Sequence, residues 1–338
     1  MTHRLGLQDL RVVRRLQSAG LELDLRREVI APSSPLLAAV KGMLLPHSGN
    51  RITTVVVDDH SGGHHLHGFA QARDRAGRPE QDIVYVAPLL SSGNGVIWTW
   101  QRLLGQIRTI AGKRGIQRVF AQIDDDRPAE IEVFRQSGFS IYTKDRIFRR
   151  GGTENRLPVE KPAYWRPMHS RDMWGLSKLT GLLVPTIVQQ AEADTTGGSK
   201  AAEEHGPWHV LTSRSSNHVL EADDREIAGH LRLWKGPRGN WIKLVLHPQV
   251  YDQAGSLLRE GLALLPSDPQ VPVYCDVRDY EGYVVSALER AGFESVAARV
   301  LMVKPLTIPI REPRRILVPA ALERPAGQVP TASSRQAE

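Results

Sequence analysis

The hydrophobic and polar positions of the first 150 residues follow two periods, one typical of strands and one of helices. Five short runs are β-branched, continuously apolar or alternating, and they predict strands at residues 52–57, 65–73, 83–90, 119–123 and 141–148. Three stretches have apolar residues at helical spacing, and they predict helices at residues 35–45, 96–111 and 128–136. Residues 11–16 and 21–29 mix apolar and charged residues in rough alternation, which predicts a strand or hairpin.

The order of elements repeats in the second half of the chain. Helical spacing recurs at residues 173–191, 251–264 and 283–290, and strand patterns recur at residues 218–221, 227–234, 241–246, 271–275 and 296–303. A stretch rich in Gly, Pro and charge at residues 151–162 predicts a linker, and the Pro-, Arg- and Ser-rich end predicts a mostly disordered tail. We therefore predict domains at residues 1–152 and 153–311 and a tail at residues 312–338.

Each half also carries the same local signature near its end. A short predicted helix is followed by Gly138-Phe139 in the first half and by Gly292-Phe293 in the second, and a predicted strand comes next. Glycine permits the left-handed conformation that ends a helix. The recurrence after roughly 150 residues indicates duplication of one domain.

Composition bounds the class of protein. The chain has 338 residues, 41% hydrophobic and 24% charged, which suits two globular cores. No apolar run approaches the ~20 residues that span a bilayer, and no signal peptide is visible, so we expect a cytoplasmic protein without a membrane partner. The single cysteine, Cys275, excludes an intramolecular disulfide and fits a reducing compartment.

The net charge of +7 and the pI of about 9.7 allow an anionic partner. The arginines are spread along the chain without a run of five, so a solvated surface is favoured over a nucleic-acid stripe. His60, His64, His65 and His67 lie close together but no cysteine accompanies them. They are interpreted as part of a hairpin turn, and no metal site is predicted.

The strongest chemical signal is a strand, a Gly-rich turn and a helix. The apolar strand ends in Ser91-Ser92-Gly93-Asn94-Gly95, and the predicted helix begins at Val96. Amide groups at such a turn and at a helix N-terminus form an anion site. Taken alone, the pattern also fits a plain connection between a strand and a helix.

This turn resembles the Arg/Gln-x-x-Gly-x-Gly/Ala loop of the GCN5-related N-acetyltransferase (GNAT) superfamily, in which the loop holds the pyrophosphate of acetyl-CoA. Val86-Ala87-Pro88 is similar to the family's Val-x-Pro strand end, and the stretch from Phe134 to Phe139 resembles its later Tyr-x-x-x-Gly-Phe element. The resemblance implies an α/β (α+β) fold of two tandem acyl-CoA N-acyltransferase-like domains, each a mixed, mostly antiparallel sheet flanked by helices. The second domain is predicted to be degenerate, because residues 249–255 hold one glycine and no Gly-x-Gly pair.

The resemblance also implies a site and a reaction. Acetyl-CoA, or another acyl-CoA, would be the co-substrate, and an amine of a small molecule or a protein would be the acceptor. The implied cofactor-binding residues are Val86, Ala87, Leu90, Ser91, Ser92, Gly93, Asn94, Gly95, Val96 and Phe134. Backbone amides near residues 85–87 would polarise the thioester carbonyl. The predicted catalytic residues, as candidate bases, are Asp82, Tyr85 and Asp124.

Two departures from the family pattern keep other functions open. Leu90 stands where the family has Arg or Gln, and Phe134 stands where a Tyr often protonates the leaving thiolate. The alternative is a non-catalytic acyl-CoA-binding or scaffold protein on the same fold. A nucleic-acid-associated protein is a third and less favoured interpretation.

Overall fold

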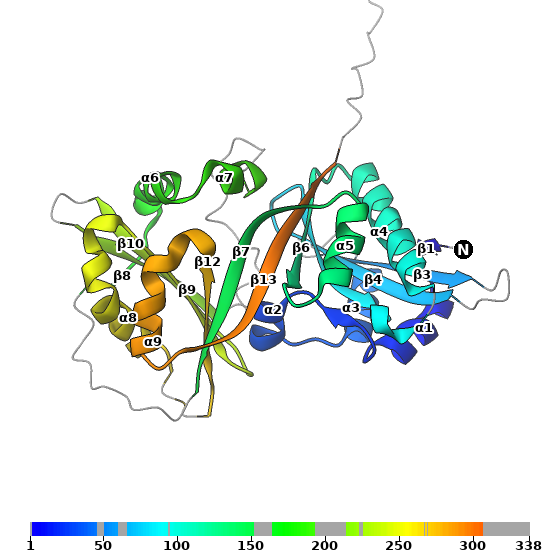
Figure 1. Ribbon diagram of the computed structural model, residues 1–338, viewed down its shortest axis with the longest axis horizontal. Coiled ribbons are helices and arrows are strands. Elements are labelled where there is room, and N and C mark those ends of the chain that lie inside the picture. The colour runs from blue at the N-terminus through cyan, green and yellow to red at the C-terminus, as the bar shows by residue number, and fades with distance from the viewer. Residues whose placement is uncertain are drawn as a thin grey trace, which may run out of the picture. The chain divides into compact units, whose positions relative to one another are not determined.

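The computed structural model describes residues 2–45, 51–59, 66–93, 95–151, 164–192, 214–222, 226–266, 268 and 270–306 (Figure 1). The strands of the first half are β1 (Thr2–Arg4), β2 (Leu21–Glu22), β3 (Ile52–Asp59), β4 (Leu66–Asp74), β5 (Glu80–Ala87), β6 (Arg118–Asp124) and β7 (Ser140–Arg150). Its helices are η1 (Leu7–Asp9), α1 (Leu10–Leu16), α2 (Leu25–Ile30), α3 (Pro35–Leu44), η3 (Leu90–Ser92), α4 (Val96–Lys113) and α5 (Pro128–Gln136).

The second half repeats this alternation. Its strands are β8 (Arg166–Pro167), β9 (Arg214–Glu221), β10 (Ile227–Lys235), β11 (Asn240–Leu246), β12 (Val273–Arg278) and β13 (Glu294–Pro305). Its helices are η4 (Ser170–Asp172), α6 (Met173–Leu183), α7 (Thr186–Glu192), η5 (Pro248–Gln253), α8 (Ala254–Ala263), η6 (Asp279–Val284) and α9 (Val285–Arg290). The predicted α/β (α+β) class, with a mixed and mostly antiparallel sheet flanked by helices, is confirmed.

Most of the predicted elements form where local chemistry favours them. The helix α3 begins at Pro35 because the Ser34 hydroxyl caps it, accepting a hydrogen bond from the amide of Leu37 at 3.2 Å. The strands β3 and β4 pair antiparallel up to Asp59 and Leu66, which agrees with the predicted hairpin, although residues 60–65 lie outside the described part. The predicted tail and most of the predicted linker also lie outside the described residues.

The strand or hairpin predicted from residue 11 to residue 29 is wrong over most of its length. Residues 10–16 form α1, in which Val13 is buried and the arginines on either side are exposed, so the period is helical. Only Leu21–Glu22 is extended in the second stretch. Asp24 then caps α2 by accepting from the amide of Arg27 at 3.1 Å.

Two predicted helices of the second half are divided. Residues 173–191 form α6 and α7, because Val184 is extended and Pro185 follows it without an N–H to donate. Residues 251–264 begin as the end of the 3₁₀ helix η5, and the α-helix starts at Ala254.

One continuous sheet joins the two halves, in the order β1-β3-β4-β5-β6-β13-β7-β12-β11-β10-β9-β8. The last strand of the second half, β13, pairs antiparallel with β6 of the first half from Arg299 opposite Asp124 to Pro305 opposite Arg118. In return, β7 of the first half pairs antiparallel with β12 of the second. The two long strands also pair with each other, and Figure 1 shows β7 in green beside β13 in orange. The halves have therefore exchanged their final strands.

The exchange places side chains of each half in the core of the other. Val300 and Met302 of β13 are buried in the first-half core with Trp100. Phe148 of β7 is buried in the second-half core with Leu257. Each hydrophobic core is thus completed by residues from the other half of the sequence. Among the described helices, none is long and apolar enough to cross a membrane.

Candidate functional site

The first-half site lies where β5 and β6 separate. These neighbouring strands run parallel and pair only from Glu80 opposite Arg118 to Asp82 opposite Phe120. On its other edge, β5 stays paired with β4 as far as Ala87. The sheet therefore opens beyond Asp82, and the segment after β5 leads directly into the predicted anion loop.

The loop has the geometry expected of an anion site. Gly93 has φ of 137° and Gly95 has φ of 85°, both in the region that favours glycine, and the 18-residue helix α4 follows. The amide of Ser92 donates to the carbonyl of Leu89 at 3.0 Å. Within the described residues, the amides of Gly93, Gly95 and Val96 have no protein acceptor. Ser91, Ser92, Gly93 and Gly95 are exposed, while Asn94 lies outside the described residues.

Beyond Asp82, the edge of β5 that no longer pairs with β6 is covered by a segment of the same half. The short strand β2 pairs antiparallel with β5, with Leu21 opposite Val86 and Glu22 opposite Tyr85. The ladder is extended by a bond from the amide of Leu23 to the carbonyl of Val84 at 2.9 Å. Because β4 holds the other edge, β2 lies along the edge that β6 leaves. This is where the family resemblance implies an amide that polarises a carbonyl.

Tyr85 fastens the segment that leads into β2. Its hydroxyl donates to the carbonyl of Gln17 at 2.7 Å and accepts from the amide of Gly20 at 3.0 Å. Burial raises the pKa of Tyr85 to about 12, and its ring stacks on Phe69 with centroids 5.3 Å apart. A β-carbon on Gly20 would lie 2.5 Å from the Tyr85 ring, so the approach requires glycine. These contacts give Tyr85 a structural role and leave its hydroxyl poorly suited to act as a base.

The two predicted carboxylates differ in their partners. Asp82, at the point where the strands separate, accepts two hydrogen bonds from the Arg75 guanidinium at 2.9 and 2.7 Å. Asp124 ends β6 with its side chain 42% exposed and 3.6 Å from Arg127. Burial of part of the carboxyl group raises the pKa of Asp124. Of the two, Asp124 is the better placed to accept a proton.

Glu22 is a third carboxylate of this opening, and sequence reasoning missed it. It lies on β2 opposite Tyr85. Although Glu22 is exposed at the surface, desolvation by the surrounding protein, together with the nearby charge of Asp24, raises its pKa to about 7. A carboxyl group that titrates near neutral pH suits general base catalysis. The alternation of Glu22, Leu23 and Asp24 was the available sequence signal.

The remaining predicted contacts are distributed between the core and the loop. Val86, Ala87 and Phe134 are fully buried, Val96 is buried, and Leu90 is half-buried against the core. The Phe134 ring meets the ring edges of Trp100 and Phe139, with centroids 6.1 and 5.0 Å apart. The Trp100 indole N–H donates to the carbonyl of Pro88 at 2.8 Å. Phe134 therefore packs α5 against α4 beside the end of β5.

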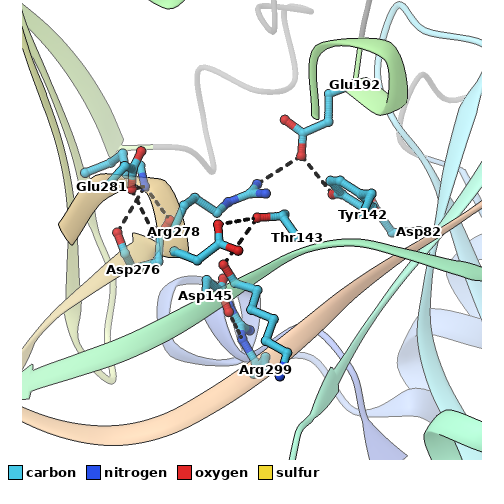
Figure 2. A network of polar contacts seen from close by, with 12 residues as sticks. Asp82, Tyr142, Thr143, Asp145, Glu192, Asp276, Arg278, Glu281 and Arg299 are labelled. Atoms are coloured by element: carbon cyan, nitrogen blue, oxygen red, sulfur yellow. Dashed lines mark hydrogen bonds and ion pairs between the residues drawn. The ribbon is translucent and has the colours of Figure 1, made fainter. Parts of the chain in front are cut away.

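A polar network spans the exchanged strands (Figure 2). Glu192 of α7 accepts from the Tyr142 hydroxyl at 2.8 Å and from Arg278 at 3.0 Å. The buried pair of Arg299 on β13 and Asp145 on β7 is bidentate, at 3.1 and 2.8 Å. Because these groups come from both halves, the network ties the first-half sheet to the second.

The second half contains a corresponding opening but a different turn. The strands β11 and β12 are parallel and pair only from Asn240 opposite Val273 to Ile242 opposite Cys275. After β11, the amide of Val250 donates to the carbonyl of His247 at 3.0 Å, and that of Gln249 to the imidazole of His247 at 3.3 Å. These amides are already used by the chain, which supports the prediction that this half no longer holds a diphosphate.

The structure adds little to the prediction that the histidines near residue 60 belong to a hairpin turn. His60, His64 and His65 lie outside the described residues, and Nδ1 of His67 lies 2.8 Å from a carboxylate oxygen of Asp58. Over the described ranges, no group of three or more His, Cys, Asp or Glu residues could hold a metal ion.

Comparison with known proteins identifies the architecture. No family model and no curated protein sequence matches the chain. Among solved structures, the chain is similar to a tandem GNAT protein from the clavulanic acid biosynthesis pathway, with a TM-score of 0.54 and 15% identity over 91% of this chain and 98% of that one. The chain therefore has the tandem GNAT fold.

Two other solved structures show weaker similarity. One is a GCN5-related N-acetyltransferase from Sphaerobacter thermophilus, with a TM-score of 0.48 and 14% identity over 90% of this chain and 95% of that one. The other is an acetyltransferase of the GNAT family from Colwellia psychrerythraea, with a TM-score of 0.45 and 8% identity over 90% of this chain and 99% of that one.

Proposed function

We propose that this chain, whose fold is that of tandem GNAT proteins, transfers an acyl group from acetyl-CoA, or another acyl-CoA, to an amine. The acceptor would be a primary amine of a small molecule or a protein. The observation that carries the proposal is the set of amides at Gly93, Gly95 and Val96, which have no protein acceptor in the described part of the chain and precede the long helix α4. Such amides and the helix dipole favour a diphosphate.

The chain's own groups define what each part of the first half would do. Gly93 and Gly95 let the backbone approach the phosphate oxygens, and β5 leads from the loop to the point where the sheet opens. A carboxylate at this opening would take the proton of the incoming ammonium. Phe134 has no proton to give, so water would protonate the departing thiolate.

Replacing Gly93 by tryptophan is expected to abolish acetyl-CoA binding. A side chain at this positive φ strains the backbone, and the indole would cover the amides of the loop. Isothermal titration calorimetry with acetyl-CoA measures the loss. Since several charge-assisted hydrogen bonds disappear together, we expect affinity to fall at least about 100-fold.

Gly77→Trp is the matched control. Gly77 also has a positive φ, of 72°, and has no other group within 4 Å of its β-carbon position, but it lies in the turn between β4 and β5. This variant should bind acetyl-CoA as the unaltered protein does. Absence of binding by the unaltered protein would remove the proposal, and equal binding by Gly93→Trp would move the site away from the loop.

A non-catalytic acyl-CoA-binding or scaffold protein is the alternative, and β2 is the observation that favours it. Its ladder with β5 covers the edge at Tyr85 and Val86 from which a backbone amide would polarise the thioester. The two functions differ in turnover. Acetyl-CoA binding without release of free CoA, across a panel of small amines and amine-bearing peptides, would support the alternative.

If the chain is catalytic, Glu22 is the base that its pKa favours. A base must be deprotonated to act, so kcat/KM should rise with pH and reach half of its plateau near the Glu22 pKa of about 7. Glu22→Gln should remove this limb and lower kcat/KM by about 100-fold. The measurement is the release of free CoA between pH 5.5 and 9.

Asp124→Asn and Glu28→Gln serve as comparisons in the same assay. Asp124 is the base predicted from the sequence, and Glu28 is an exposed carboxylate on the neighbouring helix α2. Asp124→Asn should keep the limb near pH 7, and Glu28→Gln should keep it but move it slightly to lower pH, because the Glu28 charge also raises the Glu22 pKa. If Asp124→Asn flattens the profile while Glu22→Gln does not, the base is Asp124.

A further inference from the structure

The second half contains a cavity of about 170 Å³ that lies outside the proposed acyl-CoA loop. It opens where β11 and β12 separate beyond Ile242, between the end of α6 and η6. Its lining includes Val184, Val245, Tyr251, Tyr280, Glu281 and Tyr283. We propose that this cavity binds a small molecule with one apolar ring and one hydrogen-bond acceptor, and that this ligand carries no negative charge and therefore no diphosphate.

Tyr283 supplies the polar contact. Its hydroxyl accepts a hydrogen bond from the amide of Leu246 at 3.0 Å, and among the described residues no group accepts its own proton. The Tyr283 ring stacks on Tyr251, with centroids 4.0 Å apart and ring planes within 10°. The stack fixes the ring in the cavity wall. A ligand carbonyl or ether oxygen would accept the available proton.

Beside the cavity, the carboxylates of Glu281 and Asp276 share one cation, Lys243. Glu281 accepts from the amide of Arg278 at 2.8 Å and forms an ion pair with Lys243. Lys243 also pairs with Asp276 at 3.1 Å, so both carboxylates, which are labelled in Figure 2, contact this one ammonium group. An anionic ligand would lose its hydration and find no unpaired cation among these groups, so a ligand without a negative charge is favoured.

The volume of the cavity and the turn that follows β11 limit the size and the chemical groups of the ligand. An apolar cavity of about 150 Å³ holds a benzene molecule. A space of about 170 Å³ therefore fits one six-membered ring with a short substituent. The amides of Gln249 and Val250 are consumed by His247, so a nucleotide diphosphate has no anchor beside it. The site is thus independent of the acyl-CoA loop in the first half.

The test uses benzamide as the probe, with benzene and benzoate for comparison, in ligand-observed NMR titrations of the full chain. Benzamide should bind the unaltered protein, benzene should bind more weakly, and benzoate should bind much more weakly than benzamide. Tyr283→Phe should weaken benzamide about 5- to 10-fold, as expected for one lost hydrogen bond, and leave benzene unchanged. Tyr274→Phe is the control, because Tyr274 stacks on Trp241 and does not line the cavity.

Blocking variants locate the binding. Thr180→Trp places a large ring at an exposed helix position on the cavity wall, and Val184→Phe fills the cavity from a second position. Either should abolish binding of both benzamide and benzene, whereas Gly93→Trp should not affect it. The proposal is overturned if the unaltered protein binds neither probe, if benzoate binds as well as benzamide, if Tyr283→Phe leaves benzamide unchanged, or if folded blocking variants still bind. None of these outcomes depends on acetyl-CoA.

Discussion

A protein consisting of residues 1–152 alone is expected not to fold. The strand β6 would lose its partner β13 from Asp124 to Arg118, and the outer part of β7 would lose β12. The first-half core would also lose the buried side chains of Val300 and Met302. An exposed β6 edge and an incomplete core favour aggregation. Near-ultraviolet circular dichroism and urea unfolding should show no cooperative transition.

Two rearranged proteins should fold where residues 1–152 do not. Residues 1–157 and 158–308, expressed together as separate chains, should assemble because each supplies the other's final strand. A single chain of residues 1–146, Asn-Gly and residues 298–306 should also fold, since Arg146 and Ala298 lie opposite each other and Asn-Gly favours a tight hairpin. Cooperative unfolding of residues 1–152 by themselves would show that the exchange is dispensable and would support the predicted domain boundary.

The sequence predicted the pieces of this exchange but not their pairing. Each Gly-Phe corner, at Gly138 and at Gly292, is a local signal that ends a helix and starts a strand, and both strands were found. Nothing local says which sheet a strand joins, because its partners lie far away in the sequence. Ser140, for example, is opposite Val303. Two similar halves offer two nearly equivalent places for each final strand.

The same distinction between local and distant information explains which features of the candidate site could be predicted from the sequence. The loop proposed to bind a diphosphate was recognised because glycines and a following helix are adjacent in the sequence, and Gly93 and Gly95 have positive φ values. The strand β2 lies inside the stretch predicted as a strand or hairpin, but nothing in its two extended residues, Leu21 and Glu22, indicates that it pairs with β5. The raised pKa of Glu22 was likewise hidden, since it depends on desolvation and on neighbouring charges that only the fold brings together.

Replacing Arg299 by methionine is expected to lower the free energy of unfolding by about 3–5 kcal/mol. The Arg299 and Asp145 side chains are 6% and 3% exposed and form a bidentate pair between the exchanged strands. Methionine is similar in length but leaves the Asp145 carboxylate buried without its counter-charge. Urea unfolding monitored by tryptophan fluorescence measures the loss, which should be accompanied by faster separation of the two halves.

The double variant Arg299→Met, Asp145→Leu separates this electrostatic cost from a packing defect. Removing both charges also removes the uncompensated carboxylate, so most of the lost stability should return. Arg135→Met is the surface comparison, because the pair of Arg135 and Glu132 is exposed at 62% and 53% and should matter by less than about 0.5 kcal/mol. If the double variant is as unstable as Arg299→Met, the side-chain contacts at the junction, and not the charge pair, hold the exchanged strands in register.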